Sequence, residues 1–366
     1  MRRNRSIHPR AGSRARHRRG IRSLAVTALG ASLAGALLLA AAVPSHAIEG
    51  DSLYAKPGQT FTASDGAKLN FYCRGTGSPT IVLEAGEGDW SPAWASVQPA
   101  LAQLTRTCSY DRAGAGFSGP GPRPYGEARF AEQLHSALHN GGVKGPYILV
   151  GHASGGDIVR IFADRHMSEV AGMVLIDPAE RDVETTHDLD ELWRGIDERN
   201  LGAMTFCRDA LAAGKPFPPP PPPDHRGYAC LGYPFRGLPE PRFSPELNDA
   251  ATRVMSTKVE VYDALISGIG QRPENVRRLK SHRRSLGSRP LRIVLAAYEI
   301  PPTSGLPAAE RIKFNKGFRT AGAKLLDLST NARLITTDTG AFVQWERPDI
   351  VIDAIREVYD QSKRPH

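Results

Sequence analysis

The sequence predicts an α/β protein built on a mostly parallel central sheet. Short apolar runs rich in β-branched residues recur along the chain, and most are soon followed by glycine, aspartate or proline; they lie at residues 80–83, 147–150, 170–176, 291–296 and 334–336. Segments with helical spacing lie between or after these runs, at residues 94–104, 128–140, 158–165 and 349–359. Strands that alternate with helices in this way form βαβ units, whose strands run parallel.

The last of these helices shows the pattern most clearly. Its apolar residues recur at spacings of one, three and four positions and form one stripe, made of Ile350, Val351, Ala354, Ile355 and Val358. Such a stripe is typical of a helix that packs one side against a core.

Composition and charge bound the class of protein. The chain has 366 residues, 40% of them hydrophobic, and a formal charge of +9, which would suit a nucleic-acid partner. Nine of its 47 basic residues, however, are arginines within residues 1–47, which contain no lysine and no acid, so 38 basic residues balance 38 acidic ones in the remainder. We find no aromatic–basic module, phosphate loop, dinucleotide fingerprint or metal-ligand set. We therefore expect no nucleic-acid partner, no metal and no cofactor.

Residues 1–47 have the three parts of a secretory signal peptide. An arginine-rich stretch precedes the apolar run 24–43, and Ser45 and Ala47 provide small residues at positions −3 and −1 of a cleavage site. An uncleaved membrane anchor is the alternative, because a run of about 20 residues can span a bilayer. We favour cleavage, since the run is rich in alanine and glycine and a proline follows it. The pair Arg18-Arg19 is compatible with twin-arginine export. The expected product is a secreted protein that starts near Ile48, without stable membrane insertion.

Export makes the cysteine content informative. The four cysteines would lie in an oxidising compartment, which predicts two disulfides in one of three pairings. They are Cys73, Cys108, Cys207 and Cys230.

Residues 179–289 interrupt the alternation of strands and helices. This region contains no convincing strand and carries six consecutive prolines at 218–223. It is interpreted as a helical lid inserted into a core of residues 48–178 and 290–366. The proline run predicts a stiff polyproline II segment. A partner-binding motif is one interpretation of it, and a rigid loop closed by a Cys207–Cys230 disulfide is the one we favour.

The motif that carries chemistry follows the strand predicted at 147–150. It reads Gly151-His152-Ala153-Ser154-Gly155-Gly156 and leads into a helix. A strand, Gly-x-x-x-Gly and a helix form the context of a nucleophile elbow, where glycines accommodate a strained turn and close helix packing. Here the chain resembles the α/β-hydrolase superfamily, and more closely a secreted bacterial branch with approximately Gly-His-Ser-x-Gly-Gly at this point. The resemblance extends from about residue 78 to the C-terminus and implies an α/β-hydrolase fold with a lid.

Three further segments take part in the resemblance. Residues 84–90 resemble the oxyanion loop, residues 108–114 resemble the motif of strand four, and residues 328–349 contain the region where the family carries its catalytic histidine. Because strands two and four are neighbours in that fold, the resemblance implies a Cys73–Cys108 disulfide. The oxyanion and pocket positions that it implies are Gly86, Ala153, Ser154, Ala341 and Phe342.

The sequence departs from the family pattern at two positions. The serine nucleophile of the family falls on Ala153, and its histidine, usually within Ser-Gly-His-Phe, falls on Ala341. Alanine offers neither an attacking oxygen nor a proton relay, so the acyl-enzyme route of a Ser-His-Asp triad is not expected. Ser154 is a weak substitute, because the residue after the nucleophile contributes its backbone N–H group to the oxyanion hole. His152 lies beside the turn, where a histidine is common in the family and more often structural.

Acids and arginines near the predicted site supply the remaining candidates. Glu87 places a carboxylate within the oxyanion loop, although an exposed loop glutamate is an equally good interpretation. Asp177 and Glu299 end or follow the two strands where the fold carries its triad acid, and either is a base or a structural remnant. Arginines near the start of the lid are candidates to pair with a substrate carboxylate or polarise a carbonyl, although most of them are expected to be surface charges; these are Arg181, Arg194 and Arg199.

Three functions follow from these observations. The first is a small-molecule enzyme that uses non-covalent acid–base and oxyanion chemistry, of lyase, elimination or cyclisation type, in specialised metabolism. The second is a pseudo-hydrolase that binds a small molecule or partner without converting it. The third is a serine esterase, lipase or peptidase inactivated by substitution of both catalytic residues.

Overall fold

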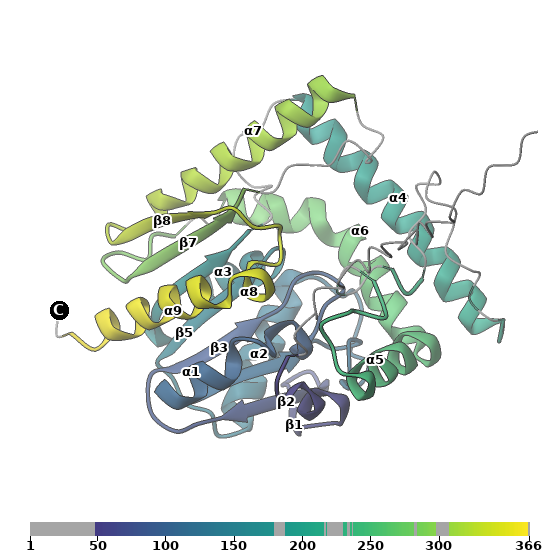
Figure 1. Cartoon of the computed structure of the whole chain (residues 1–366), viewed down its shortest axis with the longest axis horizontal. Helices are drawn as coiled ribbons and strands as arrows, with labels where there is room; N and C mark the ends of the chain where they lie inside the picture. Colours follow the sequence, from purple (N-terminus) through teal and green to yellow (C-terminus); the bar gives the residue numbers. More distant parts are fainter. Residues whose placement is uncertain are drawn as a thin grey trace, which may run out of the picture. The chain divides into compact units, whose positions relative to one another are not determined.

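The computed structural model describes residues 48–178, 187–215, 217, 230–232, 235, 237–281, 284–297 and 307–364. These residues contain one eight-stranded sheet in the order β1-β2-β4-β3-β5-β6-β7-β8 (Figure 1). The strands are β1 (Gln59–Thr62), β2 (Lys68–Arg74), β3 (Thr80–Glu84), β4 (Thr107–Asp111), β5 (Tyr147–His152), β6 (Val170–Ile176), β7 (Leu291–Ala296) and β8 (Ala332–Thr337). The pairs β1–β2 and β2–β4 are antiparallel, and every pairing from β4 to β8 is parallel. The predicted α/β class with a mostly parallel sheet is confirmed.

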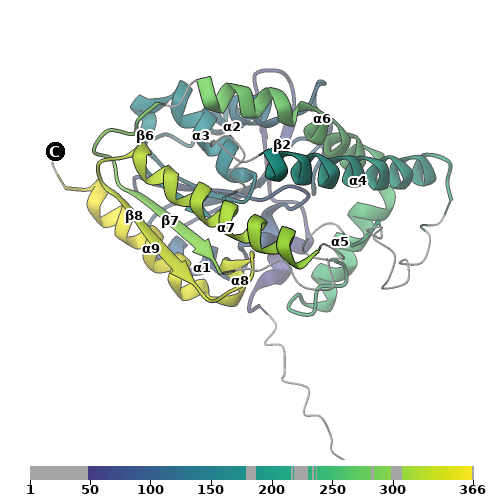
Figure 2. The ribbon, with the colours of Figure 1, turned by 90° about the horizontal axis from the view of Figure 1, so that it is seen from above.

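Helices lie on both faces of the sheet (Figures 1 and 2). The α-helices are α1 (Gln98–Leu104), α2 (Glu127–Asn140), α3 (Gly155–Arg165), α4 (His187–Ala212), α5 (Pro245–Thr257), α6 (Val259–Ser281), α7 (Ala308–Lys324), α8 (Val343–Glu346) and α9 (Pro348–Ser362). Short 3-10 helices are η1 (Asp51–Ala55), η2 (Ser91–Trp94), η3 (Met167–Glu169) and η6 (Leu325–Leu328).

Side chains that alternate along the strands divide the core into two layers. Ile81 and Leu83 of β3 pack in one layer with α1 and α9, whereas Val82 between them packs in the other with α2 and α3. The predicted stripe of α9 is confirmed: four of its five residues are fully buried, and Ile350 packs against them at the edge. Burial on both faces explains the apolar runs at residues 81–83 of β3 and 293–296 of β7.

Helices α4, α5 and α6 are the described part of the predicted lid, and no strand occurs among its described residues. Helix α6 packs against α2, α3 and α4 (Figure 2). Nothing in the fold tests the lid boundaries at 179 and 289, which stay predictions. The predicted signal peptide at 1–47 and the proline run at 218–223 lie outside the described residues.

Both predicted disulfides are present, Cys73–Cys108 and Cys207–Cys230. Cys73 of β2 and Cys108 of β4 face each other in the strand register, so the first bond joins neighbouring strands as the resemblance implied. The second closes a loop that begins within α4. Two disulfides fit an extracellular protein. None of the described helices combines the length and the apolar character that crossing a bilayer requires.

Candidate active site

The turn between β5 and α3 has a strained backbone at Ala153. Its φ is +48°, in the left-handed region that alanine rarely adopts. The N–H group of Ala153 donates to the carbonyl of Ile176 at 3.0 Å, and its own carbonyl accepts from Gly156 N–H at 3.0 Å. The sharp turn of a nucleophile elbow is therefore present, with an alanine at its apex.

The glycines around this turn allow backbone to pack on backbone. A Cβ atom on Gly151 would lie 2.7 Å from the Gly155 carbonyl oxygen. A Cβ atom on Gly155 would lie 2.5 Å from the carbonyl oxygen of Ala85 and 2.6 Å from that of Glu84. The first turn of α3 therefore lies directly against the start of the 84–90 loop, which leaves no room for side chains at these two positions.

Arg112 binds the first residues of the 84–90 loop through its guanidinium group. Its guanidinium donates to the Glu84 carboxylate and to the Ala85 carbonyl, both at 2.6 Å, and also to the Gly86 carbonyl. Tyr110 donates its hydroxyl proton to Glu84 as well. Burial raises the pKa of Glu84, and the adjacent Arg112 charge works in the opposite direction. These contacts fix the loop backbone and are structural.

A small cavity of about 50 Å³ lies between this loop, the start of α2 and the lid helix α6. Its walls are mainly apolar, and four polar or charged side chains reach it, those of Glu87, Arg112, Glu127 and Ser154. Room of this size holds a few water molecules or a small part of a substrate. Apolar walls with a few converging polar groups are typical of a small-molecule site.

Glu127, the first residue of α2, is the most perturbed acid in this cavity. Burial, followed by repulsion from the Asp157 carboxylate, raises the pKa of Glu127 to about 7. Its side chain accepts a hydrogen bond from Asn275 of α6. A carboxyl group with this pKa both accepts and donates protons near neutral pH. Glu127 is not among the acids selected from the sequence, because an acid at the start of a helix is also what simple helix stabilisation favours.

Glu87, the first acid selected from the sequence, lines the same cavity. Arg272 of α6 donates to both Glu87 and Asp197 of α4 and is itself 6% exposed. Glu87 therefore connects the 84–90 loop to two lid helices and is paired rather than fully exposed. A role as a base stays a prediction.

The residues implied by the family resemblance meet on the other side of the turn. The His152 ring donates from Nε2 to the Ala341 carbonyl at 2.9 Å, and it packs against Phe342 with ring centroids 5.0 Å apart. A Cβ atom on Gly86 would lie 3.4 Å from the Ala153 Cβ and 3.1 Å from His152 Nδ1. The loop, the turn and the segment after β8 thus converge, although only Ser154 of this group lines the cavity.

The other predicted residues differ in position. Asp177 has a φ of +42° at the end of β6, and its carboxylate accepts from the Ala296 N–H group at 3.3 Å, which is a structural contact. Arg194 and Arg199 are exposed and do not line the cavity. Arg181 and Glu299 lie outside the described residues.

Comparisons with known proteins agree with the fold. Residues 79–212 match a family model described as the alpha/beta hydrolase fold. An uncharacterized protein of Schizosaccharomyces pombe is 32% identical over 156 residues, which are 35% of this chain and 29% of that protein. The chain spans less than half the length of the first curated relatives that it matches.

Solved structures extend the likeness beyond the family match. A thermophilic esterase from Thermogutta terrifontis is 20% identical with a TM-score of 0.54, over 84% of this chain and all of that chain. The epoxide hydrolase CorEH is 18% identical with a TM-score of 0.59, over 83% of this chain and 98% of that chain. At these identities the likeness concerns the fold alone.

Proposed function

We propose that this chain, which has the α/β-hydrolase fold, is an enzyme that moves protons on a small molecule without a covalent intermediate, in a lyase- or cyclase-type reaction. One observation carries the proposal: the buried carboxyl group of Glu127, with its pKa near 7, reaches an apolar cavity beside the β5–α3 turn. Perturbed acids in a cavity are candidates for general acid–base catalysis. Ala153 at the apex of the turn, where the family has its nucleophile, argues against an acyl-enzyme route.

The start of α3 supplies electrostatic stabilisation in the proposed mechanism. In the first turn of α3 the Gly156 and Asp157 N–H groups already donate to the Ala153 and Ser154 carbonyls, so the N–H groups of Ser154 and Gly155 are the candidate donors. Such N–H groups stabilise an oxyanion that develops on a nearby carbonyl oxygen. The substrate would then carry a carbonyl group directed at Ser154 and an apolar body against Phe130 and Leu265, which line the same cavity.

The proton steps balance with Glu127 alone. Its carboxylate takes a proton from the carbon next to the carbonyl, and the electron pair of that C–H bond moves onto the carbonyl oxygen as an enolate. In an elimination, the enolate then collapses and expels a leaving group from the neighbouring carbon. In a cyclisation, the enolate carbon attacks a second electrophilic carbon of the same molecule and closes a ring. The neutral Glu127 returns its proton to the departing or newly formed oxygen.

Proton exchange tests this proposal without knowledge of the natural substrate. A panel of small apolar ketones and esters is incubated with the protein in D₂O, and deuterium uptake next to the carbonyl is followed by mass spectrometry. We expect the protein to catalyse uptake and Glu127→Gln to lower its rate by about 100-fold or more. Glu132→Gln alters a half-exposed carboxylate on the same helix and serves as the matched control, with uptake unchanged. Equal rates in Glu127→Gln and the unaltered protein would contradict the proposal.

The non-catalytic alternative makes a different prediction in the same experiment. A pseudo-hydrolase would bind a member of the panel tightly in calorimetry and leave its deuterium content unchanged. The Arg272 contacts, which join the 84–90 loop to α6 and α4, are compatible with such a binding protein.

An inactivated serine hydrolase is the third possibility, and two observations favour it. Ala153 keeps the strained φ of a nucleophile, and His152 holds the Ala341 segment close to it. The double variant Ala153→Ser with Ala341→His would then hydrolyse p-nitrophenyl esters strongly. We expect no such gain, and its appearance would favour the inactivated hydrolase over the proposed enzyme.

Export belongs to the same proposal. The two disulfides, Cys73–Cys108 and Cys207–Cys230, support export to an oxidising compartment. Expression of the full chain in a secreting host tests it, with N-terminal sequencing of the protein in the medium. We expect the secreted protein to start near Ile48, and retention of residues 1–47 in a membrane fraction would favour an uncleaved anchor.

A further inference from the structure

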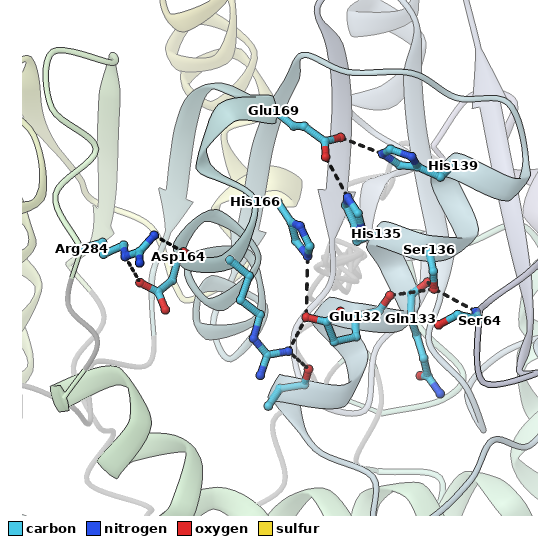
Figure 3. A network of polar contacts seen from close by, with 12 residues as sticks. Ser64, Glu132, Gln133, His135, Ser136, His139, Asp164, His166, Glu169 and Arg284 are labelled. Carbon is cyan, nitrogen blue, oxygen red and sulfur yellow. Dashed lines mark hydrogen bonds and ion pairs between the residues drawn. The ribbon is translucent and has the colours of Figure 1, made fainter.

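A histidine cluster lies on α2 away from the candidate active site. His135 and His139 are four residues apart on this helix, and both face Glu169 at the end of η3 (Figure 3). His135 Nε2 lies 2.9 Å from one carboxylate oxygen of Glu169, and His139 Nε2 lies 2.7 Å from the other. One side chain from η3 thus meets two side chains from one face of α2.

The geometry of this cluster suits a metal ion. The potential ligand atoms of the three residues all lie within 4.8 Å of one another. Ligand atoms that lie about 2.0–2.2 Å from a shared ion have to be closer to one another than 4.8 Å. Small rotations of the Glu169 carboxylate and the two imidazole rings would bring the three atoms to that spacing. Residues four apart on a helix face the same side, so both imidazoles approach one ion from one direction. Two imidazoles and a carboxylate form a donor set that suits Zn²⁺ and its neighbours in the first transition row.

The surroundings hold the cluster in place. The His166 ring stacks on the His135 ring, with centroids 3.5 Å apart and planes 4° from parallel. Arg165 and Glu132 lie beside the cluster and form an ion pair at 2.5 Å. The positive charge of Arg165 is therefore compensated and does not oppose the binding of a cation. His139 is half-exposed, which gives an ion and a fourth ligand from water access to the cluster.

We propose that His135, His139 and Glu169 bind one divalent transition-metal ion, for which Zn²⁺ is the best match. On binding, each imidazole coordinates the ion through the lone pair of Nε2, and any proton on Nε2 is released to solvent. Glu169 coordinates the same ion through one carboxylate oxygen and no longer accepts hydrogen bonds from the two rings. His135 is eight residues beyond Glu127 along α2, about 12 Å of helix rise, so the ion would not enter the candidate active site. Its effect would be to join α2 to η3 immediately before β6.

The sequence contains a pattern that points to this cluster, although no metal was predicted from it. His135-x-x-x-His139 has the spacing that places two ligands on one helix face. The third ligand comes from a separate element 30 residues beyond His139, and only the fold brings it near.

Titration of the full chain with ZnCl₂ tests the proposal, with calorimetry and thermal unfolding as the two readouts. We expect one equivalent of bound Zn²⁺ to be lost in His139→Gln and in Glu169→Gln. We also expect saturating Zn²⁺, at about 100 times its Kd, to raise the unfolding midpoint of the unaltered protein by about 5 °C and to have no such effect on these variants.

Glu132→Gln is the matched control, because it removes a neighbouring carboxylate that faces Arg165 and His166 rather than His135 and His139. It should keep the bound equivalent and the midpoint shift. Far-UV circular dichroism checks that the variants fold, which the half-exposed position of His139 favours. The proposal is overturned if Zn²⁺ leaves the midpoint unchanged, or if His139→Gln and Glu169→Gln bind as many equivalents as the unaltered protein.

Discussion

The side-chain amide of Asn275 donates a hydrogen bond to the buried carboxyl group of Glu127. The donor belongs to lid helix α6 and the acceptor begins core helix α2, 148 residues earlier in the chain. The lid therefore contacts this acid directly, and the charge of Arg272 on the same lid helix lowers the pKa of Glu127 against the effect of burial.

The raised pKa of Glu127 predicts a pH-dependent loss of stability. Its folded pKa of about 7 lies above the ordinary 4.5, so the unfolded chain releases this proton first as the pH rises. The contribution of Glu127 to the free energy of unfolding is greatest below about pH 4.5, falls between about pH 4.5 and pH 7, and is constant above about pH 7. The decline amounts to about 3 kcal/mol at most. We expect denaturant unfolding of Glu127→Gln to lack this decline between pH 4 and pH 8, and an identical pH profile in both proteins would contradict the shift.

The contacts of Arg272 predict a large effect of its removal. Arg272→Met leaves the Glu87 and Asp197 carboxylates without their shared cation, which should lower the free energy of unfolding by about 3 kcal/mol. Arg277→Met, on the same helix, removes an exposed guanidinium that pairs with the exposed Glu274 and should leave unfolding unchanged. Urea denaturation of both variants makes the comparison, and similar effects in the two would show that the Arg272 contacts are unimportant.

Gly155 predicts a destabilising substitution in the turn. The Cβ atom of Gly155→Ala would lie within 2.6 Å of two carbonyl oxygens of the β3 end, so α3 or the loop has to shift, at about 2 kcal/mol. Gly202→Ala in α4 meets nothing within 4 Å and should stabilise the helix by up to about 1 kcal/mol. Unfolding midpoints that move in opposite directions would support the packing described for the turn, and a stabilised Gly155→Ala would refute it.

The Cys207–Cys230 disulfide predicts a measurable loss when it is removed. Its cysteines are 23 residues apart, and closure of such a loop restricts the unfolded chain. The double variant Cys207→Ala with Cys230→Ala should lose about 3 kcal/mol in the free energy of unfolding. Measurement under non-reducing conditions is required. A variant as stable as the unaltered protein would mean that the unfolded chain is already restricted there.

The fold was largely predictable because the inner strands are buried on both faces. Continuous apolar runs predicted β3, β5, β6 and β7, and the structure confirms these strands. β1 and β2 were missed as apolar runs, since β1 is mostly exposed at the sheet edge and β2 begins and ends with charged residues. β4 reads Thr-Cys-Ser-Tyr-Asp, a polar sequence for a fully buried strand, and only the family resemblance indicated it.

The candidate site was less predictable because its chemistry depends on distant contacts. The turn around Ala153 follows from a local glycine pattern and was therefore visible in the sequence. The pKa of Glu127 depends on burial under α6 and on Asp157 of α3, neither of which a local pattern reveals. Glu87 was selected for its place in the loop, whereas its ion pair with Arg272 joins residues 185 positions apart.

The lid is attached to the same loop at two points. Arg272 of α6 holds Glu87, and the backbone N–H group of Phe235 donates to the Asp89 carboxylate at 2.7 Å. Both acceptors belong to the 84–90 loop, which also forms one wall of the cavity. A lid attached in this way cannot swing aside as an independent flap. A molecule that enters the cavity in the proposed reaction would have to break or carry along contacts of that wall, which would couple the rate of entry and release to the shape of the cavity.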